Sequence, residues 1–239
     1  MAGPIWESIR TTLSREISDG TFPPGAQLPT ESELAARFAV NRHTVRRALG
    51  AMRDDGLVRS RRGAGVFVIA TPIDYRLGSR TRFTQLLEAE GHASQRLVLR
   101  LDTVPATDRE AELLQIPTGA MVVLQETVGL ADGARLTYSR GVFPVDRLDG
   151  IEEALRHSNG SATTALRTCG VPDYRRAWTR IAAKRASAAT ARHLEVSDGA
   201  PLIRTRSLNV AADGTPVELG QTYFCADRVE LLVEPDTEA

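Results

Sequence analysis

Apolar residues recur with a helical period in the first part of the chain. Between Pro4 and Asp19 every fourth position is apolar, and Gly20 follows as a helix end, so we predict an amphipathic helix there. Its apolar positions are Ile5, Ile9, Leu13 and Ile17. A second, shorter helix is predicted to begin after Thr30, because Thr30 and Glu33 have the spacing of a capping box.

A third helix is predicted from Asn41 to Asp55. Asn41 is a favourable residue before the first turn, and Gly56 is suited to the end of the helix. The apolar face of this helix consists of Val45, Leu49 and Met52. Only Ala39 and Val40 are left between the second and third helices, so the two must cross steeply. This arrangement is typical of a helix-turn-helix.

Two β-prone runs follow, at residues 57–60 and 66–68, and they enclose a loop of arginine and glycine. Three helices and a basic hairpin are the elements of a winged helix-turn-helix, whose third helix enters the major groove of DNA. The charge agrees, since residues 1–70 hold ten arginines against seven acidic residues in a chain that is neutral overall. The alternative is a helical subdomain with a solvated basic face. The residues expected to contact DNA are Thr30, Arg42, His43, Thr44, Arg46, Arg47, Arg61, Arg62, Gly63 and Gly65.

The rest of the chain contains an internal repeat. Residues 108–147 match residues 188–228, and each copy reads as a short capped helix, a strand, an Asp-Gly turn and a second strand. Upstream, a strand at 97–101 matches one at 178–182, and a helix at 84–90 matches one at 161–168. We therefore predict a duplicated α-β-α-β-β unit whose hairpins form one six-stranded antiparallel sheet with helices on it. Such a repeat can also be purely structural, without a ligand.

The two equivalent helix starts carry hydrogen-bond donors. Free backbone N–H groups and the helix dipole favour negative charge at such a start, and arginine and hydroxyl side chains strengthen that preference. The donors are Arg80, Thr81 and Arg82 in the first copy, and Ser161 and Thr163 in the second. We expect the pseudo-symmetry to bring both starts towards one anion-binding cleft. The alternative is that Arg80 and Arg82 are surface residues paired with Glu88 or Glu90.

Residues 4–69 resemble GntR-type bacterial transcription regulators. The resemblance rests on the stretches 25–35, 41–49, 55–58 and 62–68. In that family the position of Ser32 is often an arginine that touches DNA. Its absence here implies that base reading depends more on Arg42 and Arg46, with Thr44 and the wing as supports. Arginine can donate two hydrogen bonds to guanine, whereas threonine usually contacts the phosphate backbone.

The second half, from about Tyr75 to Glu234, resembles the effector-binding (UTRA) domain of the HutC subfamily, which is similar to the chorismate lyase fold. Within the subfamily, residues 75–83, 173–176, 216–218 and 227–228 look most like regulators of phosphonate uptake and utilisation. Sugar-phosphate-sensing relatives have two arginines and a glutamate where this chain has Thr127, Gly129 and Ser139. The resemblance implies effector contacts from Arg80, Thr81, Arg82, Ser139, Ser161, Thr163, Glu218 and Tyr223.

Other classes of protein fit less well. The four histidines are scattered, Cys169 and Cys225 match no metal or disulfide spacing, and no nucleotide-binding loop or serine elbow is present. We therefore expect no catalytic residue, no metal and no cofactor. An enzyme on a chorismate lyase-like fold and a sequence-blind DNA binder are the alternatives. No apolar run is long enough for a membrane span, which favours a cytoplasmic protein without a membrane partner.

The sequence thus predicts an α+β protein with three parts. Residues 1–70 are the winged helix-turn-helix, residues 71–78 a linker, and residues 79–239 the domain for effector binding and dimerisation. We expect a repressor of phosphonate or phosphate acquisition genes that binds double-stranded DNA at an inverted repeat as a homodimer. The expected effector is a small anion, such as phosphate, a phosphonate or a sulfate analogue. A sugar phosphate is the alternative.

Overall fold

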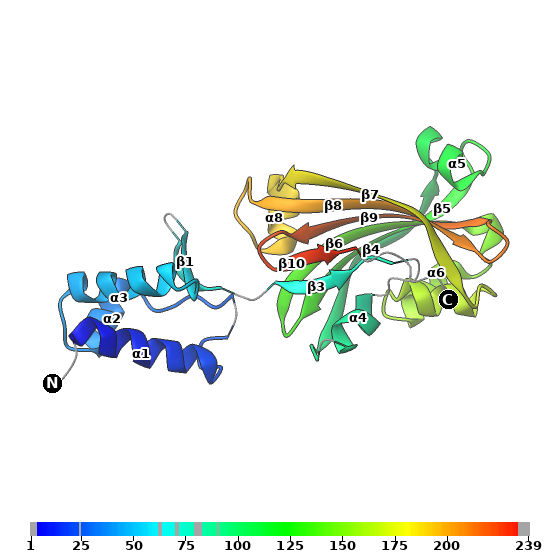
Figure 1. Ribbon diagram of the computed structural model, residues 1–239. Coiled ribbons are helices and arrows are strands. Elements are labelled where there is room, and N and C mark those ends of the chain that lie inside the picture. Colours follow the sequence, from blue (N-terminus) through cyan, green and yellow to red (C-terminus); the bar gives the residue numbers. More distant parts are fainter. Residues whose placement is uncertain are drawn as a thin grey trace. The chain divides into compact units, whose positions relative to one another are not determined.

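The computed structural model describes residues 4–23, 25–61, 64–69, 72–78, 83–89 and 91–233. The chain divides into two compact units, Met1–Thr71 and Pro72–Ala239 (Figure 1). Each unit has a hydrophobic core of its own, so each is described by itself. The predicted α+β class is confirmed: the first unit is a three-helix unit with a hairpin, and the second is a six-stranded antiparallel sheet with helices.

The first unit contains the predicted winged helix-turn-helix. Its helices are α1 (Ile5–Ser18), α2 (Glu31–Arg37) and α3 (Arg42–Asp54), and its hairpin is β1 (Val58–Arg61) with β2 (Gly65–Val68). Helix α2 begins with the predicted capping box, in which Thr30 and Glu33 satisfy each other's backbone N–H groups. The side chain of Asn41 accepts a hydrogen bond from the backbone N–H of Thr44 and so caps α3.

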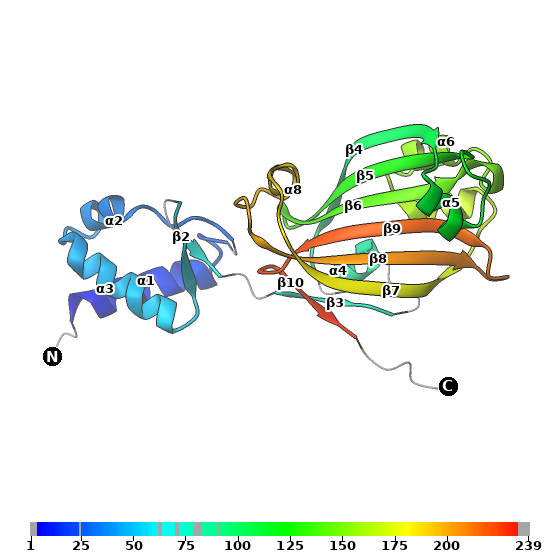
Figure 2. The same cartoon turned by 90° about the horizontal axis from the view of Figure 1, so that it is seen from above.

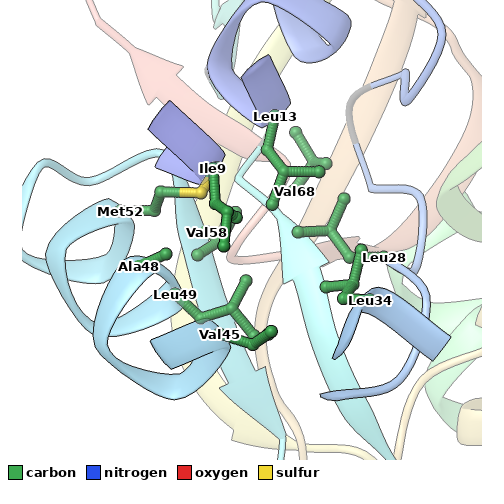
Figure 3. Close-up of a cluster of buried hydrophobic side chains, with 10 residues drawn as sticks. All are labelled: Ile9, Leu13, Leu28, Leu34, Val45, Ala48, Leu49, Met52, Val58 and Val68. Atoms are coloured by element: carbon green, nitrogen blue, oxygen red, sulfur yellow. The ribbon is translucent and has the colours of Figure 1, made fainter. Parts of the chain in front are cut away.

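The apolar stripes of the three helices meet the inner face of the hairpin in one core (Figure 3). The members of this core are Ile9, Leu13, Leu28, Leu34, Val45, Ala48, Leu49, Met52, Val58 and Val68. They come from every helix and from both strands, so the core fixes the crossing of α2 and α3 as well as the base of the wing.

The second unit is built on a sheet in the order β4-β5-β6-β9-β8-β7. The strands are β4 (Ser94–Pro105), β5 (Met121–Ala131), β6 (Ala134–Pro144), β7 (Tyr174–Arg185), β8 (Pro201–Ala211) and β9 (Pro216–Cys225). All neighbours are antiparallel, and the central pair β6 and β9 joins the two repeats. The predicted six-stranded sheet of duplicated hairpins is therefore confirmed, with a pseudo-two-fold axis between β6 and β9.

Helices cover both faces of this sheet. They are α4 (Phe83–Ala89), α5 (Asp108–Leu114), α6 (Ile151–His157), α7 (Ala162–Thr168) and α8 (Ala188–Leu194), with a 3-10 turn η1 (Val145–Arg147). The equivalent helices α5 and α8 pack on one face, at opposite ends of the sheet (Figures 1 and 2). Helices α4, α6 and α7 pack against the other face through Leu87, Leu155 and Leu166.

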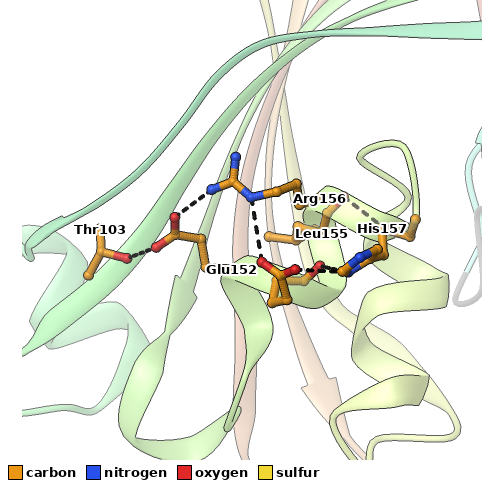
Figure 4. Close-up of polar contacts among 7 residues, drawn as sticks. Thr103, Glu152, Leu155, Arg156 and His157 are labelled. Carbon is orange, nitrogen blue, oxygen red and sulfur yellow. Dashed lines mark hydrogen bonds and ion pairs between the residues drawn. The ribbon is translucent and has the colours of Figure 1, made fainter.

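Helix α6 has no counterpart in the first repeat and was not predicted. A hydrogen bond joins it to the edge strand β4, because a carboxylate oxygen of Glu152 accepts from the Thr103 hydroxyl at 2.6 Å (Figure 4). The other oxygen of Glu152 accepts a hydrogen bond from Arg156 of the same helix at 2.8 Å. The next turn carries a second surface pair, His157 with Glu153. The helix in turn packs on α7 and so helps to place the start of α7.

The expected linker of residues 71–78 contains a strand of the second unit. Residues 73–76 form β3 (Ile73–Arg76), which pairs in parallel with β10 (Val229–Leu232). Every other residue here is apolar, and Ile73, Tyr75 and Leu77 pack with Leu87 and Phe224. This burial gives the segment a fixed place in the second unit, so it is a strand and not a free connection.

Candidate DNA interface and effector cavity

Helix α3 has one buried and one exposed face. Its buried face belongs to the core of the first unit. On the exposed face lie four of the basic residues that the sequence assigns to DNA, namely Arg42, His43, Arg46 and Arg47. A helix with a row of exposed donors along its first turns has the chemistry needed for base edges and phosphates.

Arg46 is held by a carboxylate of the preceding helix. Its guanidinium donates to both oxygens of Glu31, with an Nε–Oε1 distance of 3.1 Å and a terminal nitrogen–Oε2 distance of 2.7 Å. The Arg46 hydrogen bond lowers the pKa of Glu31, and 59% of the Arg46 side chain is still exposed. The pair therefore orients Arg46 across the helix-turn-helix and leaves it accessible.

Three of the other predicted contacts have partners within the unit. The guanidinium of Arg47 lies 4.7 Å from the centre of the Trp6 ring on α1. The Thr30 hydroxyl is bonded to Glu33 at 2.7 Å, and the Thr44 hydroxyl to Asn41 at 3.0 Å. These two hydroxyls take part in the hydrogen bonds that cap α2 and α3. A contact of either hydroxyl with DNA would therefore be formed in addition to its role at the helix start.

The wing is described only at its base. Arg62 and Gly63 lie outside the described residues, and Arg61 is described only as the end of β1. Gly65 has a φ of +105°, and a Cβ there would lie 2.6 Å from Gln27 Nε2. That nitrogen donates to the carbonyl of Ala64 at 2.8 Å. Gly65 is thus required by the backbone of the wing.

The second unit contains a cavity of about 740 Å³ on the sheet face covered by α4, α6 and α7. Four of the predicted effector contacts line it, namely Ser139, Ser161, Thr163 and Glu218. Arg80, Thr81 and Arg82 lie outside the described residues, but Phe83, Thr84 and Gln85, which follow them, line the same cavity. The first turns of α4 and α7 therefore both face it, as the pseudo-symmetry of the sequence predicts.

The assignment of Tyr223 to the cavity is wrong. Successive side chains of a strand point to opposite faces of the sheet. On β9, Glu218, Gly220 and Thr222 line the cavity, so Tyr223 points to the other face, where it packs against Tyr138 near α8. Glu218 and Tyr223 are separated by an odd number of positions and cannot share a face of a regular strand.

Sequence reasoning missed the arginines that line the cavity, and two of them, Arg96 on β4 and Arg176 on β7, form a matched pair. They occupy equivalent positions of the two repeats. Arg96 lies opposite Gly129 in the first repeat, and Arg176 lies opposite Asn209 in the second. Both residues of the second pair are 80 positions after their counterparts in the first. The repeat in the sequence could have revealed them, since both edge strands carry an arginine at the matched position. Arg96 also lies over the Phe83 ring, 5.9 Å from its centre.

Glu218 is the acidic group of this basic cavity. Its Oε2 accepts a hydrogen bond from Asn209 Nδ2 at 2.7 Å, and the oxygen of the same amide lies 3.4 Å from Arg176 Nε. Burial raises the pKa of Glu218 against the opposing effects of Asn209, Arg176 and Arg96. Burial also lowers the pKa of Arg96. Both charges are thus partly desolvated, and a ligand charge of opposite sign would relieve each of them.

The remaining wall supplies neutral donors. Hydroxyl pairs join Ser139 to Thr222 at 3.0 Å and Thr163 to Tyr174 at 2.8 Å. Gln125 Nε2 is buried and has no hydrogen-bond partner among the described residues. A buried amide donor without a partner is costly, so this nitrogen is well suited to an acceptor atom of a bound ligand.

Two family models match the chain, one to each unit. Residues 6–68 match the model "Bacterial regulatory proteins, gntR family", and residues 89–230 match the UTRA domain. The chain belongs to the GntR family and carries a UTRA domain. This agrees with the fold of both units and with the sequence resemblance, and it makes the protein a transcription regulator of the GntR/HutC type.

Full-length relatives support the same assignment for this GntR-family protein. It is 35% identical to an uncharacterized HTH-type transcriptional regulator of Rhizobium meliloti (strain 1021), over 98% of this chain and 96% of that protein. It is 33% identical to the probable transcriptional regulator PhnF of Escherichia coli (strain K12), over 96% and 94%. The crystal structure of PhnF from Mycobacterium smegmatis matches with a TM-score of 0.65 and 25% identity, over 96% and 100%.

The structure explains why this GntR-family regulator has a glycine at position 129, one of the three positions at which it differs from sugar-phosphate sensors. A Cβ at Gly129 would lie 2.5 Å from Phe83 Cζ and 2.5 Å from the Thr137 hydroxyl. Phe83 thus fills the place that a longer side chain at position 129 would need. Within the described residues, no cluster of side chains suits a metal ion, and no helix is long and apolar enough to cross a membrane.

Proposed function

We propose that this GntR-family regulator is a repressor of phosphonate or phosphate acquisition genes. It binds an inverted repeat as a homodimer through α3 and the wing, and an anionic effector in the UTRA cavity changes its affinity for DNA. The sequence resemblance of residues 75–83 and 216–218 to phosphonate regulators supports the choice of effector. A winged helix reads few base pairs, so a symmetric dimer is needed for specificity.

The observation that carries the effector class is that two arginines, Arg96 and Arg176, and one carboxylate, Glu218, line the same cavity. Its volume, about 740 Å³, is that of a site for an organic ligand, and a lone phosphate ion would leave most of it empty. We therefore favour an organic phosphonate over inorganic phosphate. The phosphonate oxygens would accept from Arg96 and from the unpaired Gln125 amide.

Glu218 indicates that the effector also carries a donor, preferably a cationic amine. The carboxylate already accepts one bond from Asn209 and feels the charges of Arg176 and Arg96, but it forms no ion pair among the described residues, and an ammonium group would supply that direct contact. An amino-phosphonate has both groups in one molecule. A sugar phosphate has hydroxyl donors and is the second candidate, but Phe83 occupies the space beside Gly129.

Titration calorimetry with matched ligands tests this proposal. The probes are 2-aminoethylphosphonate, ethylphosphonate, inorganic phosphate and glucosamine 6-phosphate. We expect 2-aminoethylphosphonate to bind best, with an affinity about tenfold or more above that of ethylphosphonate, because its ammonium group adds a charge-assisted hydrogen bond. Glu218→Gln should remove this difference in affinity. Arg96→Gln should weaken both phosphonates alike. Arg100→Gln is the control, because Arg100 lies on the same strand and pairs with Asp102.

The pH supplies a second readout. Glu218 must be ionised to attract an ammonium group, and burial raises its pKa, so the advantage of the amine should grow as the pH rises through that pKa. Binding of ethylphosphonate should not show this rise. Equal affinities of the two phosphonates for the unsubstituted protein, or binding of the sugar phosphate alone, would show that the effector class is wrong.

A further inference from the structure

The strand β3 is the part of the second unit that follows directly on the DNA-binding unit. The first unit ends at Thr71, and only residues 69–72 lie between the wing strand β2 and β3. Within the described residues, β3 has one neighbour in a sheet, β10, with which it forms a separate two-stranded pair (Figure 1). A two-stranded pair has little stability of its own, so the side-chain packing of β3 decides where the strand lies.

Tyr75 of β3 both packs this strand against the domain and lines the effector cavity. Its ring centre lies 4.9 Å from that of Phe224 on β9, edge to face, and 6.3 Å from that of Phe83 on α4. Tyr75 is buried, and among the described residues that line the cavity it is the only one that precedes α4. A single side chain thus belongs to the cavity wall and to the strand that follows the DNA-binding unit.

The Tyr75 hydroxyl is a donor without a hydrogen-bond partner among the described residues. Burial raises the pKa of Tyr75 to about 12, against the opposing effects of Arg176 and Arg96, so the hydroxyl keeps its proton at neutral pH. The charge of Glu218 acts on it as well, which places the hydroxyl among the charged groups of the cavity. A protonated hydroxyl in the same cavity as two arginines can donate to an anionic group that these arginines attract.

We propose that Tyr75 donates a hydrogen bond to the anionic group of the effector and that this contact fixes β3 in its effector-bound position. Arg96 attracts the phosphonate group, Tyr75 bonds to the same group, and the position of β3 then acts on the chain segment before it. A ligand shifts an equilibrium between two states only through contacts that differ between them, and Tyr75 supplies such a contact on β3. This inference rests on the proposed function, because it requires an anionic effector in the cavity.

A second tyrosine of the cavity provides a matched comparison. Tyr174 lines the same cavity and is as deeply buried as Tyr75, with 8% of each residue exposed. Tyr174 lies on β7, which pairs with β8 in the six-stranded sheet, and its hydroxyl is bonded to that of Thr163 at 2.8 Å. Removal of the Tyr174 hydroxyl therefore changes the wall of the cavity and leaves β3 as it is.

Fluorine NMR of the full chain labelled with 3-fluorotyrosine tests the contact directly. The chain has four tyrosines, so each signal can be assigned with one Tyr→Phe variant. We expect 2-aminoethylphosphonate and ethylphosphonate to shift the Tyr75 signal. Operator DNA without a phosphonate should shift it too, because the coupling between two ligands is reciprocal. The signals of Tyr138 and Tyr223, which stack on each other on the opposite face of the sheet, serve as references.

A second experiment measures the coupling by fluorescence anisotropy of labelled operator. Tyr75→Phe keeps the ring and removes only the hydroxyl. We expect it to weaken the binding of 2-aminoethylphosphonate about tenfold or more, and to reduce several-fold the ratio of operator affinities with and without saturating 2-aminoethylphosphonate. Tyr174→Phe should keep the full ratio. Asp74→Asn is the control for β3, because Asp74 is exposed on the other side of the strand and does not line the cavity.

The outcomes separate this inference from the proposed function. A full ratio of operator affinities in Tyr75→Phe, or an equal loss in Tyr174→Phe, would overturn the role of Tyr75 and leave the phosphonate effector intact. A Tyr75 signal that the phosphonates shift and the operator does not shift would overturn it as well. If neither phosphonate bound the unsubstituted protein, the choice of effector would be wrong. The operator alone would then decide: a shift of the Tyr75 signal supports the link between β3 and DNA binding, and an unchanged signal overturns it.

Discussion

At the scale of single residues, the basic side chains of α3 differ in how they are held. Arg46 is fixed by hydrogen bonds to both carboxylate oxygens of Glu31, whereas Arg47 packs on Trp6 of α1. A side chain that is already oriented loses less conformational entropy when it binds. Arg46 is therefore the best placed of these residues to recognise a base, and Glu31 is its positioning residue.

We predict that Arg46→Ala removes specific operator binding and leaves the first unit folded. A bidentate contact between arginine and guanine contributes about 1–3 kcal/mol of discrimination, so specific binding should fall towards the level of nonspecific binding. Footprinting on the operator measures the effect. Arg15→Ala on α1 is the control, because it removes the same charge from an exposed position outside α3. Unchanged protection by Arg46→Ala would exclude Arg46 from base reading.

The residues of the cavity show what the sequence can and cannot predict at this scale. Ser161 and Thr163 could be assigned because a helix start with hydroxyl donors is a local pattern. Arg96 and Arg176 were missed because each is one of several arginines in a strand that is mostly exposed, and no local pattern distinguishes it from the others. Their meeting in one cavity depends on the sheet order, which brings the two repeats together only through β6 and β9.

At the scale of elements, periodicity and capping predicted the helices of the first unit and the hairpins of the second. These signals are local, so the sequence contains them in full. Helix α6 and the pair β3 and β10 were not predicted. The two paired strands are more than a hundred and fifty residues apart, and a parallel pair has no turn signal. Tyr223 was misplaced because its alternation along β9 was not followed to the face it implies.

The base of the wing offers a test at this scale. Gly65→Ala should destabilise the first unit by about 1–3 kcal/mol, because φ is +105° and the added Cβ would displace Gln27. Gly50→Ala is the control: Gly50 lies inside α3, a Cβ there has room at 3.6 Å from Arg53, and alanine favours a helix by up to about 1 kcal/mol.

Both glycine variants can be measured in the full chain. The chain has two tryptophans, Trp6 in α1 and Trp178 in β7, so a Trp178→Phe background leaves fluorescence that reports the first unit alone. Urea unfolding should shift to lower concentration for Gly65→Ala and to higher concentration for Gly50→Ala. Shifts in the same direction for the two variants would show that the strained backbone and the Gln27 contact do not limit the stability of the wing.

At the scale of the whole molecule, the backbone of the duplicated sheet is symmetric, but the side chains at matched positions of the two repeats differ in charge. On one face, Thr137 and Glu218 occupy matched positions of β6 and β9, and the carboxylate gives the cavity its single acidic group among the described lining residues. On the other face, Glu126 and Arg206 occupy matched positions and carry opposite charges. The proposed effector binding of this unit thus depends on a position where the two repeats differ.

In a regulator of this kind, effector binding in the cavity must change the affinity for DNA. By thermodynamic linkage, this coupling can be measured either as the effect of the effector on DNA binding or as the effect of DNA on effector binding. If 2-aminoethylphosphonate changes operator affinity by some factor, operator DNA must change the affinity for 2-aminoethylphosphonate by the same factor, typically about 5–150-fold. We predict that the two factors agree for the unsubstituted protein. Fluorescence anisotropy of labelled operator gives one factor, and calorimetry with and without operator gives the other.

Glu218→Gln should reduce the coupling without changing operator affinity in the absence of effector. Glu218 lies in the cavity of the second unit, whereas the predicted DNA contacts all lie in the first, so the substitution removes a differential contact with the ligand and no contact with DNA. Arg46→Ala should do the reverse, lowering operator affinity while 2-aminoethylphosphonate binds the free protein as before. If Glu218→Gln retained the full change in operator affinity at saturating 2-aminoethylphosphonate, the amine contact would not take part in switching. The phosphonate contact at Arg96 would then have to carry the whole coupling.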